Sequence, residues 1–294
     1  MDFVQFAASH GVIVEHPIAD GRVRRVPTVH RPKKRNAKYR LFSDGFGWVN
    51  AYDSADGFNF YRPDTKPDPA RVAEWKARAD RERVEQAAEW ARRAYEALEI
   101  VRRCTYASHP YLVNKGFVDA RGLVDPSTVT FRIDDDVVEP HADCLVVPMR
   151  HYRTAELQSI QWVSATGRKK YLPGGRAWNA CFSIGAPRVR AVVCEGYATG
   201  KTIAEALALL YRQERVVVCF SAANLKHVAP QFGPDTIVVA DNDAPDKHGR
   251  QAGQEAAQAT GLPWVMPEDQ DTDADDLRQR CGIRAVADLL RAIL

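Results

Sequence analysis

The sequence has no closely spaced pair of cysteines. Structural zinc sites use cysteines separated by only a few residues, whereas the six cysteines of this chain are scattered. They are Cys104, Cys144, Cys181, Cys194, Cys219 and Cys281. Cys194 and Cys219 stand in valine-rich runs, where a thiol behaves as a small buried apolar group. We therefore expect no structural zinc.

Long apolar runs are also absent. No stretch has the length of a membrane-spanning helix, and residues 1–10 lack the basic start and apolar middle of a signal peptide. Charged residues make up 27% of the chain and hydrophobic residues 45%, which excludes wholesale disorder. At 294 residues, the chain is expected to form two or three compact units in the cytoplasm, with no membrane partner.

The net charge is only +3, but basic residues crowd the N-terminal segment. Apolar and polar residues alternate at 39–42 and 47–52, so residues 1–66 are expected to form a small β-rich unit. Six cations are candidate nucleic-acid contacts, namely Arg24, Arg25, Lys33, Lys34, Arg35 and Lys38. Proteins that bind single strands combine cations with stacking rings. The rings available are Tyr39, Phe46, Trp48, Tyr52, Phe58, Phe60 and Tyr61. The alternative is a solvated basic loop without a partner.

The middle of the chain is predicted to contain a helical connector and a basic α+β subdomain. Residues 67–103 are rich in Ala, Glu and Arg and favour a long helix. Residues 104–188 contain strand patterns at 145–149 and 157–163, which we expect to be neighbours joined by a polar turn. Cations and glycines at 168–176 suit a triphosphate or a nucleic-acid backbone. A solvated turn is the alternative for Lys169 and Lys170.

Valine-rich and alanine-rich segments alternate from residue 189 to residue 294. We predict strands at 189–194, 216–220, 236–240 and 263–266. Helices are predicted near 201–211, 224–230, 249–260, 275–281 and 283–294. This alternation predicts parallel strands covered by helices on both faces. The expected fold class is α/β for this part and α+β overall.

Acidic residues follow two of these predicted strands. Glu195 ends the first strand, and Asp241 ends the third, with Asp243 two residues later. Ligands gather at the carboxyl ends of parallel strands, and three carboxylates brought together there repel unless a cation screens them. Such ligands suit Mg²⁺ or Mn²⁺, which indicates phosphoryl or nucleotidyl transfer. In the acidic loop after the last strand, Asp273 and Asp276 are candidate ligands for a second ion.

Two other interpretations of these segments compete with a metal site. In the first interpretation, Glu195 only caps a helix, and Asp241 and Asp243 only form a polar turn. No single turn, however, explains why acidic residues follow both strands. Residues 196–202 resemble a phosphate-binding P-loop, yet three residues separate their glycines where a P-loop has four. The spacing therefore disfavours an ATPase.

The motifs EGYATG at 195–200, DND at 241–243 and DADDL at 273–277 resemble the Toprim domain of bacterial-type primases, topoisomerases and related nucleases. The EGYATG form is similar to primases of phages, plasmids and other mobile elements. Residues 109–116, 145–149 and 169–176 resemble the basic half of the catalytic core of those primases. Residues 24–28 and 33–39 resemble the front end of phage-borne members.

The resemblance implies roles for individual residues. Glu195 would be the acid–base carboxylate and a metal ligand, while Asp241 and Asp243 would bind the catalytic metal. Four cations would face the template or the incoming nucleotide, namely Lys115, Lys169, Lys170 and Arg176.

The function that this resemblance implies is a DNA primase. Such an enzyme makes short RNA primers on single-stranded DNA from ribonucleoside triphosphates, with Mg²⁺ or Mn²⁺. The chain has neither the zinc-binding front domain of bacterial replicative primases nor a fused helicase, so we expect a separate replicative helicase as partner. The alternatives are a metal-dependent Toprim nuclease and a non-catalytic replication accessory that binds single-stranded DNA. The sequence leaves open whether a bacterium, a plasmid or a phage encodes the chain.

Overall fold

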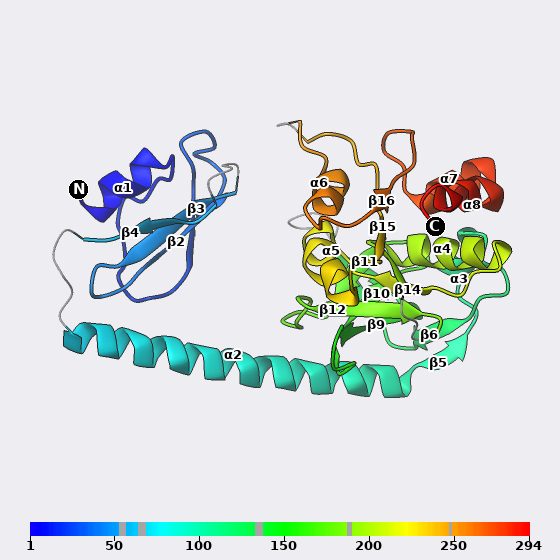
Figure 1. Ribbon diagram of the computed structural model, residues 1–294. Coiled ribbons are helices and arrows are strands. Elements are labelled where there is room, and N and C mark those ends of the chain that lie inside the picture. Colours follow the sequence, from blue (N-terminus) through cyan, green and yellow to red (C-terminus); the bar gives the residue numbers. More distant parts are fainter. Residues whose placement is uncertain (53–56, 64–68, 133–137, 187–189, 247–248) are drawn as a thin grey trace. The chain divides into compact units, whose positions relative to one another are not determined.

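The computed structural model describes residues 1–52, 57–63, 69–132, 138–186, 190–246 and 249–294 (Figure 1). The chain divides into two compact units, Met1–Ala87 and Ala88–Leu294, and helix α2 (Pro69–Arg103) contributes to both. The domain boundaries expected near residues 66 and 188 lie outside the described residues, and the four-segment division stays a prediction. In the part of the chain that is described, no helix is long and apolar enough to cross a membrane.

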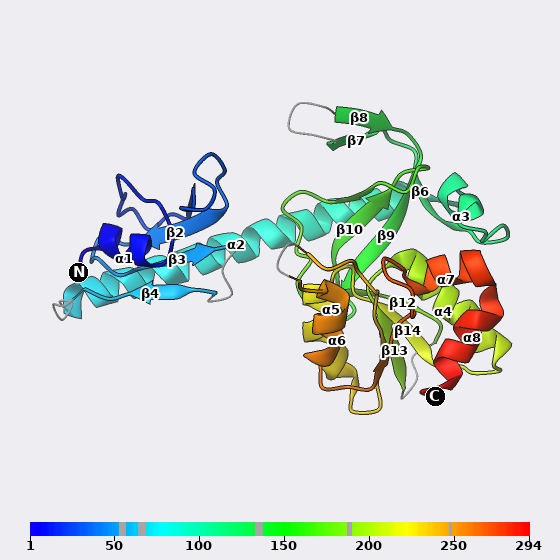
Figure 2. The ribbon, with the colours of Figure 1, turned by 90° about the horizontal axis from the view of Figure 1, so that it is seen from above.

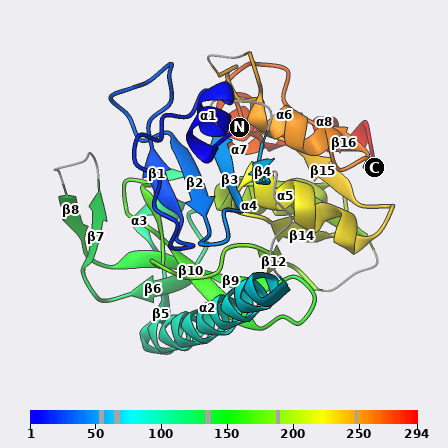
Figure 3. The same cartoon turned by 90° about the vertical axis from the view of Figure 1, so that its left-hand side faces the viewer.

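The first unit is a four-stranded antiparallel sheet with one short helix. The strands lie in the order β1 (Arg24–Val26), β2 (Ala37–Leu41), β3 (Gly47–Ala51) and β4 (Asn59–Tyr61). Helix α1 (Phe3–Ser9) lies over this sheet (Figures 1 and 3). A capping box between Asp2 and Gln5 starts the helix. The strands expected at 39–42 and 47–52 are present as β2 and β3, whereas α1 was not expected.

Alternation along β2 and β3 gives this sheet two different faces. Ala37, Tyr39 and Val49 are buried together with Phe3 of α1. Residues at positions 38, 40, 48 and 50 are less buried and point to the other side, because successive side chains of a strand point to opposite faces. The apolar core of this unit therefore lies on the α1 side of the sheet.

The helical connector expected at 67–103 is present as α2. Ala, Glu and Arg favour a helix, and Arg93 pairs with Glu89 and Glu96 one turn away on either side. Ala97 and Ile100 are buried in an apolar cluster with residues of β9 and β10. These contacts anchor the C-terminal turns of α2 to the second unit.

The second unit is built on a ten-stranded mixed sheet in the order β11-β10-β9-β12-β14-β13-β15-β16, with β6 beside β9 and β5 beside β6. The strands are β5 (Thr105–Ala107), β6 (Gly122–Asp125), β9 (Cys144–His151), β10 (Leu157–Val163), β11 (Lys169–Tyr171), β12 (Ala180–Ile184), β13 (Ala191–Cys194), β14 (Arg215–Val218), β15 (Ile237–Val239) and β16 (Trp264–Val265). A separate hairpin pairs β7 (Val129–Arg132) with β8 (Val138–His141), and α3 (Pro110–Asn114) precedes β6. Strands β9 and β10 are the antiparallel neighbours that the sequence predicts.

Four parallel strands, β14, β13, β15 and β16, form one end of this sheet. The helices are α4 (Tyr197–Leu209), α5 (Ala222–Val228), η1 (Ala229–Phe232), α6 (Ala252–Gln258), α7 (Ala274–Cys281) and α8 (Ile283–Arg291). Helices α4, α7 and α8 lie on one face, and α5 and α6 lie on the other (Figure 2). Val192 packs toward the first group and Val193 toward the second. The predicted α/β arrangement is confirmed, although residue 189 of its first predicted strand lies outside the described residues.

A buried carboxylate ties the end of α2 to the sheet. Asp125 is fully buried and accepts two hydrogen bonds of 2.9 Å from the Arg103 guanidinium. Trp162 donates its indole N–H over 3.0 Å, and the hydroxyl of Ser127 donates over 2.8 Å. Burial alone would raise the pKa of Asp125, but these hydrogen bonds, first that of Arg103, outweigh it and lower the pKa to about 2.

We expect this carboxylate to make the fold sensitive to acid. The folded-state pKa of Asp125 lies below its ordinary value of 3.8, so its stabilisation is complete above that pH and is lost as the pH falls toward about 2. The loss amounts to roughly 2 kcal/mol. Asp125→Asn should be less stable at pH 7 and should lack this part of the acid dependence. Urea unfolding between pH 2 and pH 7 measures both effects, with the exposed Asp119→Asn as control. An unchanged acid dependence in Asp125→Asn would contradict this assignment.

Candidate metal centre

The sheet topology brings the two acidic strand ends together. Strands β13 and β15 are adjacent and parallel, with Val192 opposite Ile237 and Val193 opposite Val238. Glu195 follows β13 directly, and Asp241 comes two residues after the end of β15. The carboxyl ends of neighbouring parallel strands meet at one rim, so the condition on which the predicted acidic site depends is met.

Glu195 is held at this rim by the start of α5. The backbone N–H of Ala222 donates a hydrogen bond to its carboxylate, and its own carbonyl accepts one of 2.8 Å from the N–H of Phe220. Burial raises the pKa of Glu195, and the charge of Asp243 adds to this, while the charge of Lys169 acts in the opposite direction. A carboxyl group with a raised pKa suits proton transfer.

Asp241 combines an unpaired carboxylate oxygen with a raised pKa. Its Oδ1 atom is buried, and no hydrogen-bond donor reaches it among the described residues. Burial raises the pKa of Asp241 to about 8, and the charges of Asp273, Glu195 and Asp243 contribute in that order. An unpaired buried carboxylate among like charges is costly for a fold unless a cation screens it. Hard oxygen donors of this kind fit a Mg²⁺ or Mn²⁺ ion.

Asp243 is oriented by the start of α6. Its Oδ2 atom accepts a 2.8 Å hydrogen bond from the backbone N–H of Gly253. A Cβ atom on Gly253 would lie 2.3 Å from the carbonyl oxygen of Asp241 and 3.1 Å from Asp243 Oδ2. Only glycine permits this approach of α6. Asn242, between the two aspartates, is buried and donates to the carbonyls of Pro267 and Glu268, which fixes the loop. Neither Gly253 nor Asn242 was predicted as a site residue, because neither stands out without the fold.

The two further predicted ligands, Asp273 and Asp276, form the capping box of α7. Asp273 Oδ1 accepts the backbone N–H groups of residues 275 and 276, and Asp276 accepts the N–H of Asp273. The other oxygen of Asp273 accepts a 3.0 Å hydrogen bond from the Thr199 hydroxyl. The Asp273 carboxylate nevertheless makes the largest charge contribution to the raised pKa of Asp241. Asp273 therefore borders the rim, while the hydrogen bond of Asp276 is local to α7.

Asp275, which was not predicted as a site residue, is neutralised inside the protein. Among the described residues, Asp273, Asp275 and Asp276 are the only three acidic or metal-binding side chains whose ligand atoms lie within 4.8 Å of one another. Asp275 is fully buried and pairs with Lys115 over 2.7 Å and with Arg278 over 2.8 Å. Burial alone would raise the pKa of Asp275, but these partners lower it. The Lys115 ammonium, predicted to face nucleotide or template, is thus placed in an internal ion pair.

The other predicted cations lie in three different environments. Lys169 and Lys170 are consecutive residues of β11, so their side chains point to opposite faces of the strand. The charge of Lys169 acts on Glu195 and Asp241. Lys170 instead donates a 2.5 Å hydrogen bond to the carbonyl of Thr130 in the hairpin. The Arg176 guanidinium lies 4.6 Å from the ring centre of Trp90. The structure therefore brings Lys169, alone of these three, to the acidic rim.

The segment that resembles a P-loop binds acidic side chains instead of forming a phosphate cradle. Gly196 is the N-cap of α4, and Gly200 lies inside that helix. A Cβ atom on Gly200 would lie 2.5 Å from a methyl carbon of Val218, so this glycine permits close packing on the sheet. Thr199 is committed to Asp273. These contacts agree with the spacing argument against an ATPase.

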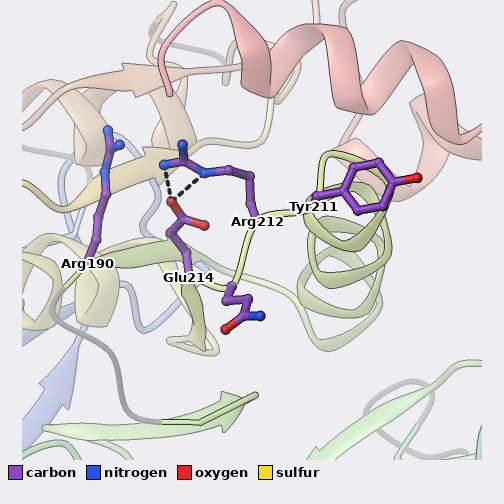
Figure 4. A pocket seen from close by; sticks show the side chains of 5 residues that line it. Arg190, Tyr211, Arg212 and Glu214 are labelled. Atoms are coloured by element: carbon purple, nitrogen blue, oxygen red, sulfur yellow. Dashed lines mark hydrogen bonds and ion pairs between the residues drawn. The ribbon is translucent and has the colours of Figure 1, made fainter.

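Figure 4 shows the residues that line a surface depression of about 390 Å³. Arg190, Tyr211, Arg212, Gln213 and Glu214 line it. These residues immediately precede β13 and β14, so the depression is at the amino ends of the parallel strands. The carboxylates are at the carboxyl ends, and the depression therefore plays no part in the acidic site.

The comparison with protein families agrees with this fold and site. The model of the Toprim domain matches residues 190–284. That range contains the five predicted carboxylates, Glu195, Asp241, Asp243, Asp273 and Asp276. The C-terminal part of the second unit is therefore a Toprim domain, as the resemblance of its motifs predicted.

One relative that matches most of this chain is a DNA primase. The sequence is 25% identical to DNA primase TraC of Escherichia coli over an alignment 293 residues long, which covers 90% of this chain. The chain spans about a quarter of that relative, 26% of its length. The predicted resemblance to a Toprim-domain DNA primase is thereby confirmed.

Three solved primase structures are similar to this chain. The Aquifex aeolicus primase with zinc-binding and RNA polymerase domains has 14% identity and a TM-score of 0.37, over 55% of this chain and 43% of the other. A chain in the structure of the bacteriophage T7 lagging-strand DNA polymerase with primase domains has 17% identity and a TM-score of 0.40, over 64% and 92%. The DnaG catalytic core has 15% identity and a TM-score of 0.37, over 77% and 74%.

Proposed function

We propose that this chain carries the catalytic core of a DNA primase, which joins ribonucleotides into short primers on single-stranded DNA. The observation that carries the proposal is the unpaired, buried Oδ1 of Asp241 among the carboxylates of a Toprim domain. The similarity to a DNA primase over 90% of the chain supports the choice of reaction. A separate replicative helicase would supply the single-stranded template.

In this proposal, Asp241, Asp243 and Glu195 hold a divalent cation, with Asp273 beside them. A bound Mg²⁺ or Mn²⁺ would neutralise charge on the transferring phosphate, and Asp276 remains the candidate ligand for a second ion. The raised pKa of Glu195 suits it to accept the proton of the attacking 3′-hydroxyl. Gly253 and Ala222 keep the carboxylates of Asp243 and Glu195 oriented.

Lys169 would attract the triphosphate of the incoming nucleotide. It is an exposed residue of β11 whose charge already acts on Glu195 and Asp241. Tyr171, on the same side of β11, donates a 2.8 Å hydrogen bond to the carbonyl of Phe220, next to the segment that orients Glu195. This bond ties β11 to the acidic rim and so supports the position of Lys169.

We expect Lys169→Ala to raise the KM for ribonucleoside triphosphates by about tenfold or more. Hydrogen bonds to charged groups contribute about 1.5–3 kcal/mol, and a tenfold change corresponds to about 1.4 kcal/mol. Lys170→Ala is the matched control, because its amine bonds Thr130 on the opposite side of the strand. Steady-state primer synthesis at varied triphosphate concentration measures both variants. A larger effect of Lys170→Ala would contradict this assignment.

The proposed reaction is tested with the purified protein, single-stranded DNA of mixed sequence, the four ribonucleoside triphosphates, and Mg²⁺ or Mn²⁺. Short RNA products that require triphosphates, metal and Asp241 would support a primase. Breakdown of DNA without triphosphates would show the nuclease instead. Binding of DNA without either product would show a replication accessory.

A further inference from the structure

The N-terminal sheet carries cations and aromatic rings on the face opposite α1. Strand pairing determines which side chains share this face. Arg25 of β1 lies opposite Lys38 of β2, and Trp48 of β3 lies opposite Phe60 of β4. Lys38 and Trp48 alternate with the buried residues of β2 and β3. Tyr39, although aromatic, points to the α1 side and belongs to the core. The structure thus separates the aromatic residues of this segment into packing residues and surface residues.

Four rings gather on or beside this face, and we name Trp48, Tyr52, Phe58 and Phe60 the aromatic face. Phe60 is 68% exposed, Phe58 49% and Tyr52 46%. Phe58 packs edge-on against Trp48 with ring centres 4.9 Å apart, and it is stacked with Phe60 at 6.5 Å. Rings exposed to this degree contribute little to a core, so their gathering on one surface calls for another role.

Two cations are interleaved with these rings. The Lys38 ammonium lies 5.0 Å from the ring centre of Phe58 and 5.4 Å from that of Tyr52. The Arg25 guanidinium lies 5.9 Å from the same Tyr52 ring. In contrast, Arg24, which points to the α1 side, is paired with Asp20 over 2.6 Å. Lys38 and Arg25 form no ion pair with a carboxylate within the described segments.

We propose that the aromatic face binds single-stranded DNA, with bases stacked on Phe58 and Phe60 and phosphates beside Lys38 and Arg25. Aromatic rings interleaved with cations match a strand whose bases are unpaired, since each base offers a flat face and each linkage a negative charge. A duplex hides its base faces and fits such a surface poorly. The choice of DNA over RNA rests on the proposed function, whereas the surface itself belongs to the first unit and contains none of the Toprim carboxylates.

The aromatic face differs from the basic loop that the sequence indicates most strongly. Lys33, Lys34 and Arg35 stand between β1 and β2, in a segment without an aromatic residue. Such a loop would attract phosphates by charge alone. The two surfaces are therefore distinguished by whether rings or only cations matter for binding.

Binding is tested on the full chain in EDTA without triphosphates, so that catalysis plays no part. The probe is a fluorescently labelled oligothymidylate, and its Kd is measured by anisotropy. We expect Phe60→Ala to weaken binding by about tenfold, because stacking of one base on an aromatic side chain is worth about that or more. Lys38→Gln should weaken binding and also reduce its salt dependence. The control is Tyr211→Ala, which removes a ring that is 96% exposed in the second unit.

Crosslinking locates the bound strand directly. Oligonucleotides with 5-iodouracil should attach to peptides that contain Trp48, Phe58 or Phe60. Crosslinks found only beyond residue 88 would overturn the proposal, as would an unchanged Kd for Phe60→Ala. Loss of binding only after Lys33, Lys34 and Arg35 are all replaced by Gln would assign binding to the loop instead. Equal or tighter binding of duplex DNA or of the matching oligoribonucleotide would overturn the commitment to single-stranded DNA. None of these results depends on whether primers are made.

Discussion

Replacement of Asp241 by asparagine should abolish primer synthesis and at the same time stabilise the metal-free protein. Asn has no charge to hold a cation, and the loss of metal stabilisation of the transferring phosphate is worth several kcal/mol, or about a thousandfold in rate. In the metal-free fold, however, the Oδ1 atom of Asp241 is buried with no hydrogen-bond donor among the described residues, and the charges of Asp273, Glu195 and Asp243 add to the raised pKa of this carboxyl group. Removal of one of these charges should raise the free energy of unfolding by roughly 1–3 kcal/mol.

The two effects are measured by primer synthesis and by urea unfolding in EDTA. The control is Asp246→Asn, which changes a carboxylate of the same loop that pairs with Arg250. This control should retain activity and should not become more stable. An Asp241→Asn protein with normal activity would exclude Asp241 as a metal ligand. A variant that is inactive and also less stable in EDTA would show instead that Asp241 supports the fold.

Gly253→Ala should lower activity by about ten- to a hundredfold, although alanine favours helices more than glycine does. The new Cβ would meet the Asp241 carbonyl at 2.3 Å, a distance at which something must shift. Displacement of α6 would also disturb the 2.8 Å hydrogen bond that holds Asp243. Loss of a group that orients a metal ligand typically costs ten- to a hundredfold in metal affinity or activity.

Titration of activity with Mn²⁺ separates this effect from simple unfolding. We expect Gly253→Ala to need more Mn²⁺ for half-maximal activity while its urea unfolding shows a folded protein. The neighbouring Gln254→Ala makes a change in the same helix without the steric conflict and should leave the titration unchanged. Equal metal requirements in the parent protein and in Gly253→Ala would show that α6 does not position Asp243.

Much of the C-terminal fold could be predicted because its signals are local. Valine-rich runs separated by alanine-rich segments mark buried strands and their helices, and the long helix α2 follows from composition. Short elements such as β5, β7 and α1 were missed, since a pattern of three to seven residues carries little information. The continuity of the sheet through β12, which pairs with both β9 and β14, also depends on contacts that no local pattern shows.

The predicted site likewise combines features that the local sequence shows with features that depend on contacts between distant segments. The positions of Glu195 and Asp241 directly after valine-rich strands could be recognised from the sequence. Their proximity could not, because it requires β13 and β15 to be neighbours across more than one intervening element. The internal pairing of Lys115 with Asp275 likewise joins two segments far apart in the chain.

The sequence by itself determined where the strands end, which carboxylates follow them, and that cations and rings crowd the N-terminal segment. These properties follow from the period and the boundaries of each element, which neighbouring residues encode. Only the tertiary structure decided that the Oδ1 atom of Asp241 is buried with no hydrogen-bond donor among the described residues. It also decided that Lys169 and not Lys170 reaches the rim, and which rings of the first sheet face outward. The physical reason is that burial, charge proximity and choice of face arise from strand pairing and packing between distant segments.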